Sequence, residues 1–368
     1  MFPFFKWSRS NSTALKRYLL GLSFLFSLPF ALKAQDPVFS QFYAYKLYMN
    51  PAGSGSEPGL NLSAIYRNQW NEVYKSLSTY GFASDIRSER LSSGFGLIAF
   101  QDRASNVYKT SYIGGTYAYI LRLTRRLNVN IGVGGAFVSK AIDADRLIFS
   151  DQIDPVGGIT GESVVNIVRE KVRYFDMNAG LLTQFSFDIG RYEAHNSLGF
   201  AVQHLTRPDE SFENLDARLP MRYTLHYGSM IPLDLSKKKS GAAFYFSPVF
   251  RFDYQAKTKV YTAGFYNIFN PVYFGIFYQD NQFSNGGNTK ALILHGGVKI
   301  PFSEYTNMIV GYSYDLDITG VTTRSKGVHE VSLRVNIEDM TIFDKKPSKG
   351  GRGVPCYDFG GKNSIRIF

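Results

Sequence analysis

The feature that most constrains this chain is an alternation of side-chain character at every second residue. Apolar side chains occupy most odd positions from Leu127 to Phe137, and amide or small side chains occupy the even ones. Such a 180° repeat places the two sets on opposite faces of a β-sheet. Segments 244–254 and 327–337 repeat the pattern, and their polar face carries charges. Because charges are unwelcome in a dry sandwich core, the pattern favours a barrel with a wet or hydrogen-bonded lumen and an apolar face toward lipid. These lumen-side charges are Arg251, Asp253, Glu330 and Arg334.

Alternating segments of this kind recur along the chain, and we count about fourteen, an even number within the range of bacterial outer-membrane barrels. Most have a length near the roughly 9–11 residues that a tilted strand needs to cross a membrane. The sequence therefore predicts an all-β, antiparallel transmembrane β-barrel over residues 60–337. The segments are 60–67, 77–86, 92–101, 109–121, 127–139, 172–185, 196–204, 220–232, 242–254, 259–268, 271–280, 290–302, 305–316 and 327–337.

The connections between these segments fall into two sets. One set contains the long connections 140–171 and 205–219, together with the short 255–258. The other set consists of 87–91, 122–126, 186–195, 233–241, 269–270 and 303–304. Outer-membrane barrels have short periplasmic turns and long extracellular loops. We therefore expect the two chain ends of the barrel, at residues 60 and 337, to face the periplasm.

Residues 1–34 have the layout of a secretory signal peptide. A basic start precedes an apolar run from Tyr18 to Phe30, which is too short to span a bilayer as a helix. Cleavage near Gln35 would remove five basic and no acidic residues, so the formal charge falls from +11 to +6. The remaining excess does not indicate nucleic-acid binding. A basic rim that meets outer-membrane lipid and lipopolysaccharide headgroups fits an exported barrel better.

Two segments lie outside the predicted barrel. Residues 35–59 form an N-terminal arm that is rich in aromatic residues, and an exposed arm of this kind would be a liability. We expect it to pack inside the barrel or against a partner, and Asn50-Pro51 to end it in a turn. Residues 338–368 form a basic tail, which we expect to be extended until it meets a partner in the periplasm.

The sequence offers no pattern that supports catalysis or a bound cofactor. The five histidines are scattered, without the spacing of a metal site. The single cysteine, Cys356, cannot form an intramolecular disulfide. The acidic residues of 140–171 are of a type that can hold Ca²⁺, but their spacing matches no EF-hand, and we interpret them as solvated loop charges. We therefore expect no enzyme activity, no cofactor and no metal.

Several stretches resemble one family in the same order along the chain. They are Gln35-Asp36-Pro37-Val38-Phe39-Ser40-Gln41-Phe42, Leu47-Tyr48-Met49-Asn50-Pro51-Ala52, Tyr66-Arg67-Asn68-Gln69-Trp70, Gly199 to Pro208, and Gly311-Tyr312-Ser313-Tyr314-Asp315 with His329-Glu330-Val331-Ser332-Leu333. Together they resemble the PorP/SprF proteins, which are outer-membrane components of the type IX secretion system in the Bacteroidetes. The resemblance covers residues 35–336, and the end of the tail departs from it.

The resemblance implies a partner-binding role in protein export. Family members support export or surface attachment of type IX cargo and meet other components of the machine. Within the family we favour the SprF branch, which serves a large gliding adhesin, over the PorP branch, which serves the secretion core. The expected partner-binding residues are Phe39, Phe42, Tyr48, Asn50, Arg67, Trp70, Lys345, Lys346, Lys349 and Arg352.

Two other functions remain open from the sequence. A channel or hydrophobic-substrate transporter shares the barrel pattern, and ion conductance would favour it. An outer-membrane hydrolase would need a Ser or Asp within hydrogen-bond reach of one of the five histidines.

Overall fold

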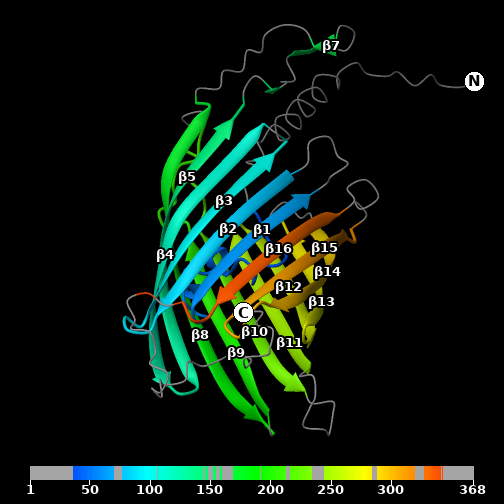
Figure 1. Ribbon diagram of the computed structural model, residues 1–368. Helices are drawn as coiled ribbons and strands as arrows, with labels where there is room; N and C mark the ends of the chain where they lie inside the picture. The colour runs from blue at the N-terminus through cyan, green and yellow to red at the C-terminus, as the bar shows by residue number, and fades with distance from the viewer. Residues whose placement is uncertain are drawn as a thin grey trace, which may run out of the picture. The chain divides into compact units, whose positions relative to one another are not determined.

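The computed structural model describes most of the predicted barrel and the N-terminal arm (Figure 1). The described residues are 36–69, 77–105, 107–143, 146–147, 152–154, 158–159, 169–190, 192–212, 216–233, 244–283, 288–319, 327–340 and 342. The expected signal segment, Trp70 and the basic residues of the tail lie outside them.

Fourteen strands of the described residues close into one antiparallel barrel, which confirms the predicted fold class. They are β1 (Leu60–Gln69), β2 (Leu77–Ser88), β3 (Ser93–Ala104), β4 (Tyr108–Thr124), β5 (Leu127–Ile142), β8 (Lys171–Ile189), β9 (Tyr192–Gln203), β10 (Arg222–Leu233), β11 (Phe244–Gln255), β12 (Thr258–Phe269), β13 (Val272–Gln282), β14 (Asn288–Pro301), β15 (Thr306–Asp317) and β16 (Val328–Ile337). Each strand pairs with its neighbours in chain order, and β1 pairs with β16 to close the barrel, Leu60 lying opposite Ile337.

Two connections differ from the prediction. Residues 186–195 are not a connection, because β8 continues to Ile189, β9 begins at Tyr192, and Ser186 pairs with His195 across the hairpin. Their polar composition resembles a loop, but it is an inward face that hydrogen-bonds across the strands, as Ser186 does with Glu193. The long connection is also shorter than predicted, since β5 runs on to Ile142. It contains a small hairpin of β6 (Ile153–Asp154) and β7 (Gly158–Ile159).

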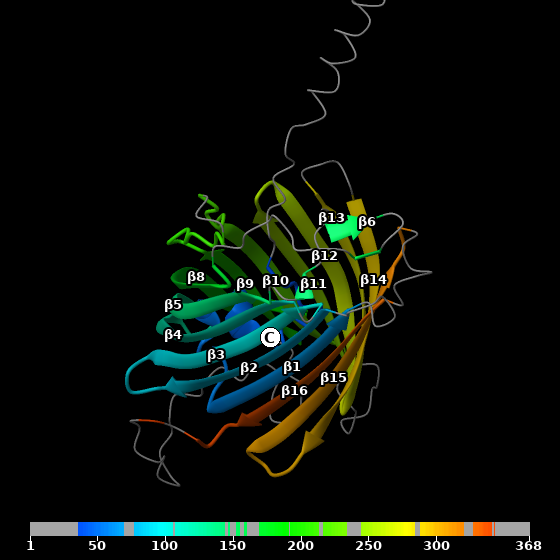
Figure 2. The ribbon, with the colours of Figure 1, turned by 90° about the horizontal axis from the view of Figure 1, so that it is seen from above.

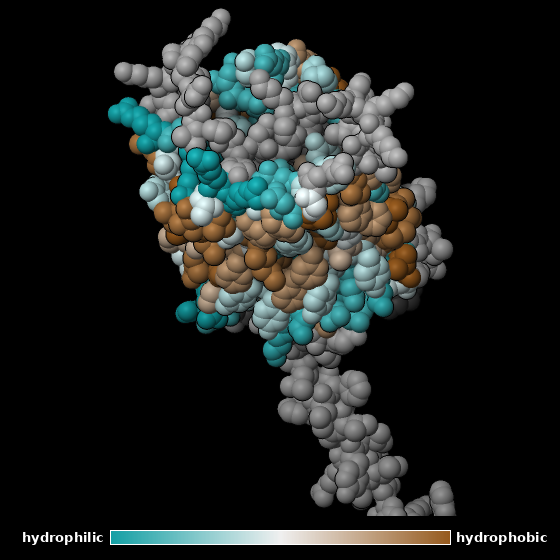
Figure 3. Space-filling view, turned by 90° about the horizontal axis from the view of Figure 1, so that it is seen from below, coloured by the Kyte–Doolittle hydropathy of each residue, from teal (hydrophilic) through white to brown (hydrophobic). Residues whose placement is uncertain are grey.

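The two faces of the sheet carry the residues that the alternation assigns to them. On β5, Ile131 and Phe137 are 50% and 69% exposed and point outward, while Asn130 is fully buried inside. On β11, Arg251 and Asp253 are buried on the lumen side. Figure 3 shows the resulting apolar surface between more polar margins. No helix among the described residues has the length and apolar character needed to cross a membrane.

The barrel has two different ends. The connections 143–170 and 204–221 lie at one of them, which we call the long-connection end. The turns 125–126, 190–191 and 270–271 lie at the other, the short-turn end, where β1 begins and β16 ends. This asymmetry agrees with the expected division of the connections.

Candidate functional site: an N-terminal arm inside the barrel

Residues 36–59, which we call the arm, run through the lumen from one end of the barrel to the other. Asp36 lies at the long-connection end, within hydrogen-bond distance of His204 and Gln255. The arm then forms the short helix α2 (Lys46–Met49) and the 3-10 turn η2 (Pro51–Gly53), and it enters β1 at the short-turn end. Figure 2, seen along the barrel, shows this blue segment enclosed by the strands. The arm therefore packs inside the barrel, one of the two expected outcomes.

The first half of the arm is bound by a buried ion cluster on β1, β15 and β16. The Arg67 guanidinium lies 2.8 Å from the Glu330 carboxylate and 3.2 Å from that of Asp315. The backbone N–H groups of Ser40 and Gln41 donate to the two oxygens of Glu330, at 3.0 and 2.6 Å. Hydrogen bonds to ionised groups are roughly twice as strong as neutral ones. The cluster therefore holds the arm backbone against the wall at this point.

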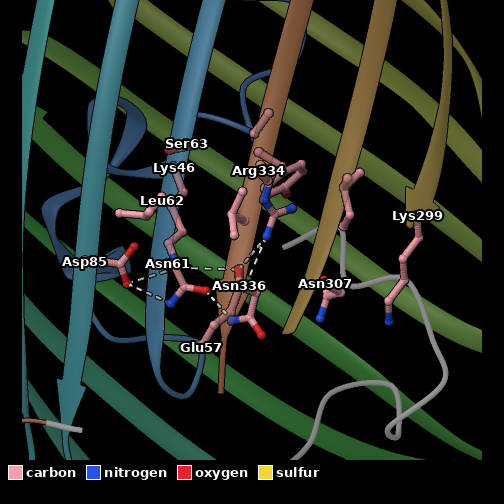
Figure 4. Close-up of a pocket in the computed structure, with 14 residues that line it drawn as sticks. Lys46, Glu57, Asn61, Leu62, Ser63, Asp85, Lys299, Asn307, Arg334 and Asn336 are labelled. Atoms are coloured by element: carbon pink, nitrogen blue, oxygen red, sulfur yellow. Dashed lines mark hydrogen bonds and ion pairs between the residues drawn. The ribbon is translucent and has the colours of Figure 1, made fainter. Parts of the chain in front are cut away.

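A second charged cluster binds the end of the arm near the short-turn end (Figure 4). The Lys46 ammonium lies 3.2 Å from Asp85 and 3.4 Å from Glu57. Glu57 also accepts from Arg334 on β16, at 2.9 and 3.0 Å. Two cations and two carboxylates thus pair within one buried site, and the arm supplies one of each. These residues line a pocket together with Asn61, Lys299 and Asn307.

Asn50 joins the arm to another part of the wall, at β8, β9 and β10. Its side-chain oxygen accepts from the backbone of Ala52 and caps η2, while Nδ2 donates to the carbonyl of Leu181 and lies 3.2 Å from His226. Wall glycines make room for this turn, since a Cβ at Gly132 would overlap the backbone of Ala52, and one at Gly180 the Asn50 side chain. The glycines on the polar face of the sheet are therefore a docking surface for the arm.

Aromatic rings fill the space that the polar contacts leave. Phe39 and Phe42 are 2% and 3% exposed, and the Phe39 ring packs edge-on to Tyr48 with 5.1 Å between centroids. The guanidinium of Arg222 lies 5.0 Å from the centre of the Tyr48 ring, and that of Arg251 5.2 Å from Phe42. Aromatic faces attract cations at such distances. The wall arginines thus bind the arm through its rings as well as its polar groups.

His204, just after β9, is clamped between two carboxylates. Its Nε2 lies 2.6 Å from Asp36 of the arm and its Nδ1 lies 2.8 Å from Asp176 of β8. Burial would lower the pKa of His204, but the two carboxylates outweigh it and raise that pKa to about 9. Burial would raise the pKa of Asp36, but His204 and Arg222 hold it well below its usual value. At neutral pH, His204 is therefore an imidazolium held between the carboxylates of Asp36 and Asp176.

This clamp meets the criterion set for a hydrolase, an Asp in contact with a histidine, without providing hydrolase chemistry. Both nitrogens of His204 donate to carboxylates, so neither can accept a proton from a nucleophile. His226 contacts the amide of Asn50, and His295 lies 3.4 Å from the Tyr266 hydroxyl. No group of three or more potential metal ligands occurs among the described residues.

Five of the predicted partner-binding residues come together in the lumen: Phe39, Phe42, Tyr48, Asn50 and Arg67. Trp70, Lys345, Lys346, Lys349 and Arg352 lie outside the described residues. Four further residues complete the two ion clusters and were not predicted from the sequence: Lys46, Glu57, Asp85 and Asp315. Their polar positions in alternating strands, or beside apolar arm residues, marked them as inward-facing but gave no partners.

Comparisons with known proteins place the sequence in a wider context. Residues 31–335 match the family described as type IX secretion system membrane protein PorP/SprF. No curated protein matches the chain.

Among solved structures, the chain is similar to the CymD monoaromatic hydrocarbon channel, with 12% identity, 83% of this chain and 94% of that chain covered, and a TM-score of 0.40. A bacterial polysaccharide outer membrane secretin gives 7% identity, coverage of 76% and 98%, and a TM-score of 0.39. The translocator domain of the autotransporter NalP from Neisseria meningitidis gives 11% identity, coverage of 89% and 97%, and a TM-score of 0.28.

Proposed function

Because the chain belongs to the PorP/SprF family of type IX secretion system membrane proteins, we propose that it is a closed scaffold that supports export or surface attachment of particular cargo. Its general role follows from the family: it is an outer-membrane component of type IX secretion. The observation that carries the finer proposal is the arm, which occupies the lumen and is bound by two buried ion clusters. A lumen filled in this way favours a scaffold over a channel.

The proposed orientation puts the short-turn end in the periplasm. Long extracellular connections and short periplasmic turns are typical of outer-membrane barrels. Connections 143–170 and 204–221 would then face the cargo outside the cell. Cleavage of residues 1–34 belongs to the same proposal, and N-terminal sequencing of the purified protein tests it.

We assign two kinds of contact to the predicted partner-binding residues. Phe39, Phe42 and Tyr48 are enclosed by the barrel, so they act by holding the arm in place. The basic residues of the tail, from Lys345 to Arg352, would meet an acidic periplasmic component of the machine. That contact should weaken as salt rises, because exposed charges are screened.

Deletion of the gene, followed by comparison of the secreted and surface proteomes with those of the parent, tests the proposal. A SprF-type role predicts the loss of one or a few cargo proteins, such as a large gliding adhesin. A PorP-type role predicts the loss of most type IX cargo. Normal secretion and display of every protein would contradict the export role and leave the channel function.

We propose that the protein has no catalytic activity. His204, the histidine found between carboxylates, binds the arm through Asp36, and both of its ring nitrogens are occupied by the carboxylates. If purified protein hydrolysed lipid or peptide substrates, and the activity were lost on changing His204, this part of the proposal would fail.

A further inference from the structure

An open, mostly apolar groove lies on the outward face of the wall from β1 and β2 through β3, β4 and β5 to β8. At its centre Gly115 and Gly135 pair across β4 and β5 and leave the sheet without side chains. Leu97 and Met177, both exposed, flank the glycines on the neighbouring strands. The groove has a volume of about 570 Å³. No residue of the arm lines this groove.

Basic residues mark four of these strands, β3, β4, β5 and β8, nearer the long-connection end. Arg103 pairs with Lys109, Lys109 with Ala141, and Ala141 with Lys171, so three cations share one level of the outer wall. Arg173 lies two residues after Lys171 on β8, on the same face and closer to the groove. All four side chains are exposed, and none forms an ion pair with a carboxylate of the described residues. Like charges placed directly opposite in a sheet repel each other unless an anion joins them.

The surface between the basic level and the groove is apolar. Ile113, Phe137 and Phe175 lie side by side there, each with an exposed ring or side chain. At roughly 3.4 Å per residue, Lys109 lies about 20 Å from Gly115 along β4. The order of the basic residues, the apolar surface and the groove, and the distance between the first and the last, match a lipid. Its phosphorylated headgroup would contact the cations, and its acyl chain would lie along the strands into the groove.

We propose that this face is a binding site for the phosphorylated glycolipid of the outer leaflet, lipid A. The choice of leaflet rests on the proposed orientation, which puts the basic level on the outer side. The attraction comes from the headgroup phosphate, because cations near an anionic membrane surface stabilise binding. The groove itself supplies no hydrophobic driving force, since an acyl chain is in an equally apolar environment elsewhere in the bilayer. The groove adds specificity by close packing of one chain where the glycines lack side chains.

Native mass spectrometry of the purified full chain in detergent, mixed with lipid A or separately with phosphatidylglycerol, tests the site. The combined variant Arg103→Ala, Lys109→Ala, Lys171→Ala and Arg173→Ala should bind lipid A about 1,000-fold more weakly. Its control is Lys257→Ala with Lys259→Ala, two exposed cations near the same end that lie away from the groove.

Gly115→Leu fills the groove and should also weaken binding. Its Cβ would have only the Gly96 carbonyl within 4 Å, at 3.9 Å, so the barrel accepts the change. Gly296→Leu, at a site with no atom within 4 Å, is the matched control. Heat-modifiable migration verifies that each variant has folded.

The proposal would be overturned if the variant with four substitutions and the Gly115→Leu variant both bound lipid A as tightly as the wild type. Phosphatidylglycerol bound as tightly as lipid A would overturn the assignment to lipid A. Binding in detergent does not depend on which end faces outward. Surface labelling of a Lys257→Cys, Cys356→Ser variant on intact cells therefore tests the orientation independently.

Discussion

At the scale of single residues, the lumen is organised by charges that are paired between neighbouring strands and between the wall and the arm. Arg67 neutralises two carboxylates that also bind the arm backbone, and removing one partner of such a cluster leaves buried charge uncompensated. Exposed cations on the outer wall have no comparable role in stability. Substitutions at the two kinds of position should therefore differ sharply.

Arg67→Met should destabilise the folded barrel by about 3–5 kcal/mol, because Glu330 and Asp315 lose their counter-ion. The temperature at which heat-modifiable migration changes on gels measures this loss. Lys259→Met, at an exposed position, is the control and should change that temperature little. A normal transition for the Arg67 variant would show that the cluster does not stabilise the protein.

The His204 clamp predicts a pH dependence with a definite sign. The folded-state pKa of His204 is raised to about 9 from its usual 6.5. The stability it contributes is therefore complete below about 6.5 and is lost as pH rises through about 9. Thermal midpoints measured between pH 6 and 10 should fall over this range in the wild type, and less in His204→Gln. Parallel curves for the two proteins would contradict the assignment.

At the scale of elements, the arm behaves as an additional core inside a barrel. Its rings form two buried clusters with wall residues, one around Phe42 and Tyr43 and one around Phe39, Tyr45 and Tyr48. Wall glycines and Asn50 place η2 between the clusters. The arm thus combines apolar packing with fixed polar contacts at both ends.

Alanine at Phe39, Phe42 and Tyr48 together should lower the heat resistance of the barrel. Burial of each ring contributes on the order of 1.5–3 kcal/mol, and the cavities left behind add to the loss. The gel transition temperature again reports it. Phe137→Ala, which removes an outward ring that is 69% exposed, is the matched control. Equal transitions in the two variants would mean that the arm is not part of the stable fold.

At the scale of the whole molecule, a barrel of this size would leave a lumen for water if the arm were absent. The arm crosses the lumen from Asp36 at the long-connection end to Gly59 before β1. Closure and plugging are thus achieved by one chain. Under the proposed function, this property separates a scaffold from a channel.

Planar-bilayer recordings should therefore show little conductance for the wild type, and clear conductance steps after deletion of residues 36–58. The deletion removes the contacts of both ion clusters with the arm, and this loss could unfold the barrel. The gel migration of the variant should therefore first show that it is folded. Steady wild-type currents equal to those of the deletion would favour the channel function over the scaffold.

Much of this architecture could be predicted from the sequence. The two-residue period assigned the fourteen strands, their lumen and lipid faces and the inward position of Arg251 and Glu330. The aromatic composition of the arm indicated that it would be buried. These are local properties, because alternation and burial follow from each segment's own side chains. Prediction was wrong at 186–195, where inward polar residues resembled a loop.

The charge pairings were decided only by the tertiary structure. Ser40 donates to Glu330 from 290 positions away, and Glu57 pairs with Arg334 from 277 positions away. The alternation shows that Glu330 and Arg334 face inward, and the composition of the arm indicates that it is buried, but neither contains information on which residues meet. That depends on the register in which β16 closes on β1 and on the path of the arm across the lumen. Alternation is a property of each segment, whereas pairing inside a closed barrel is a property of all fourteen strands together.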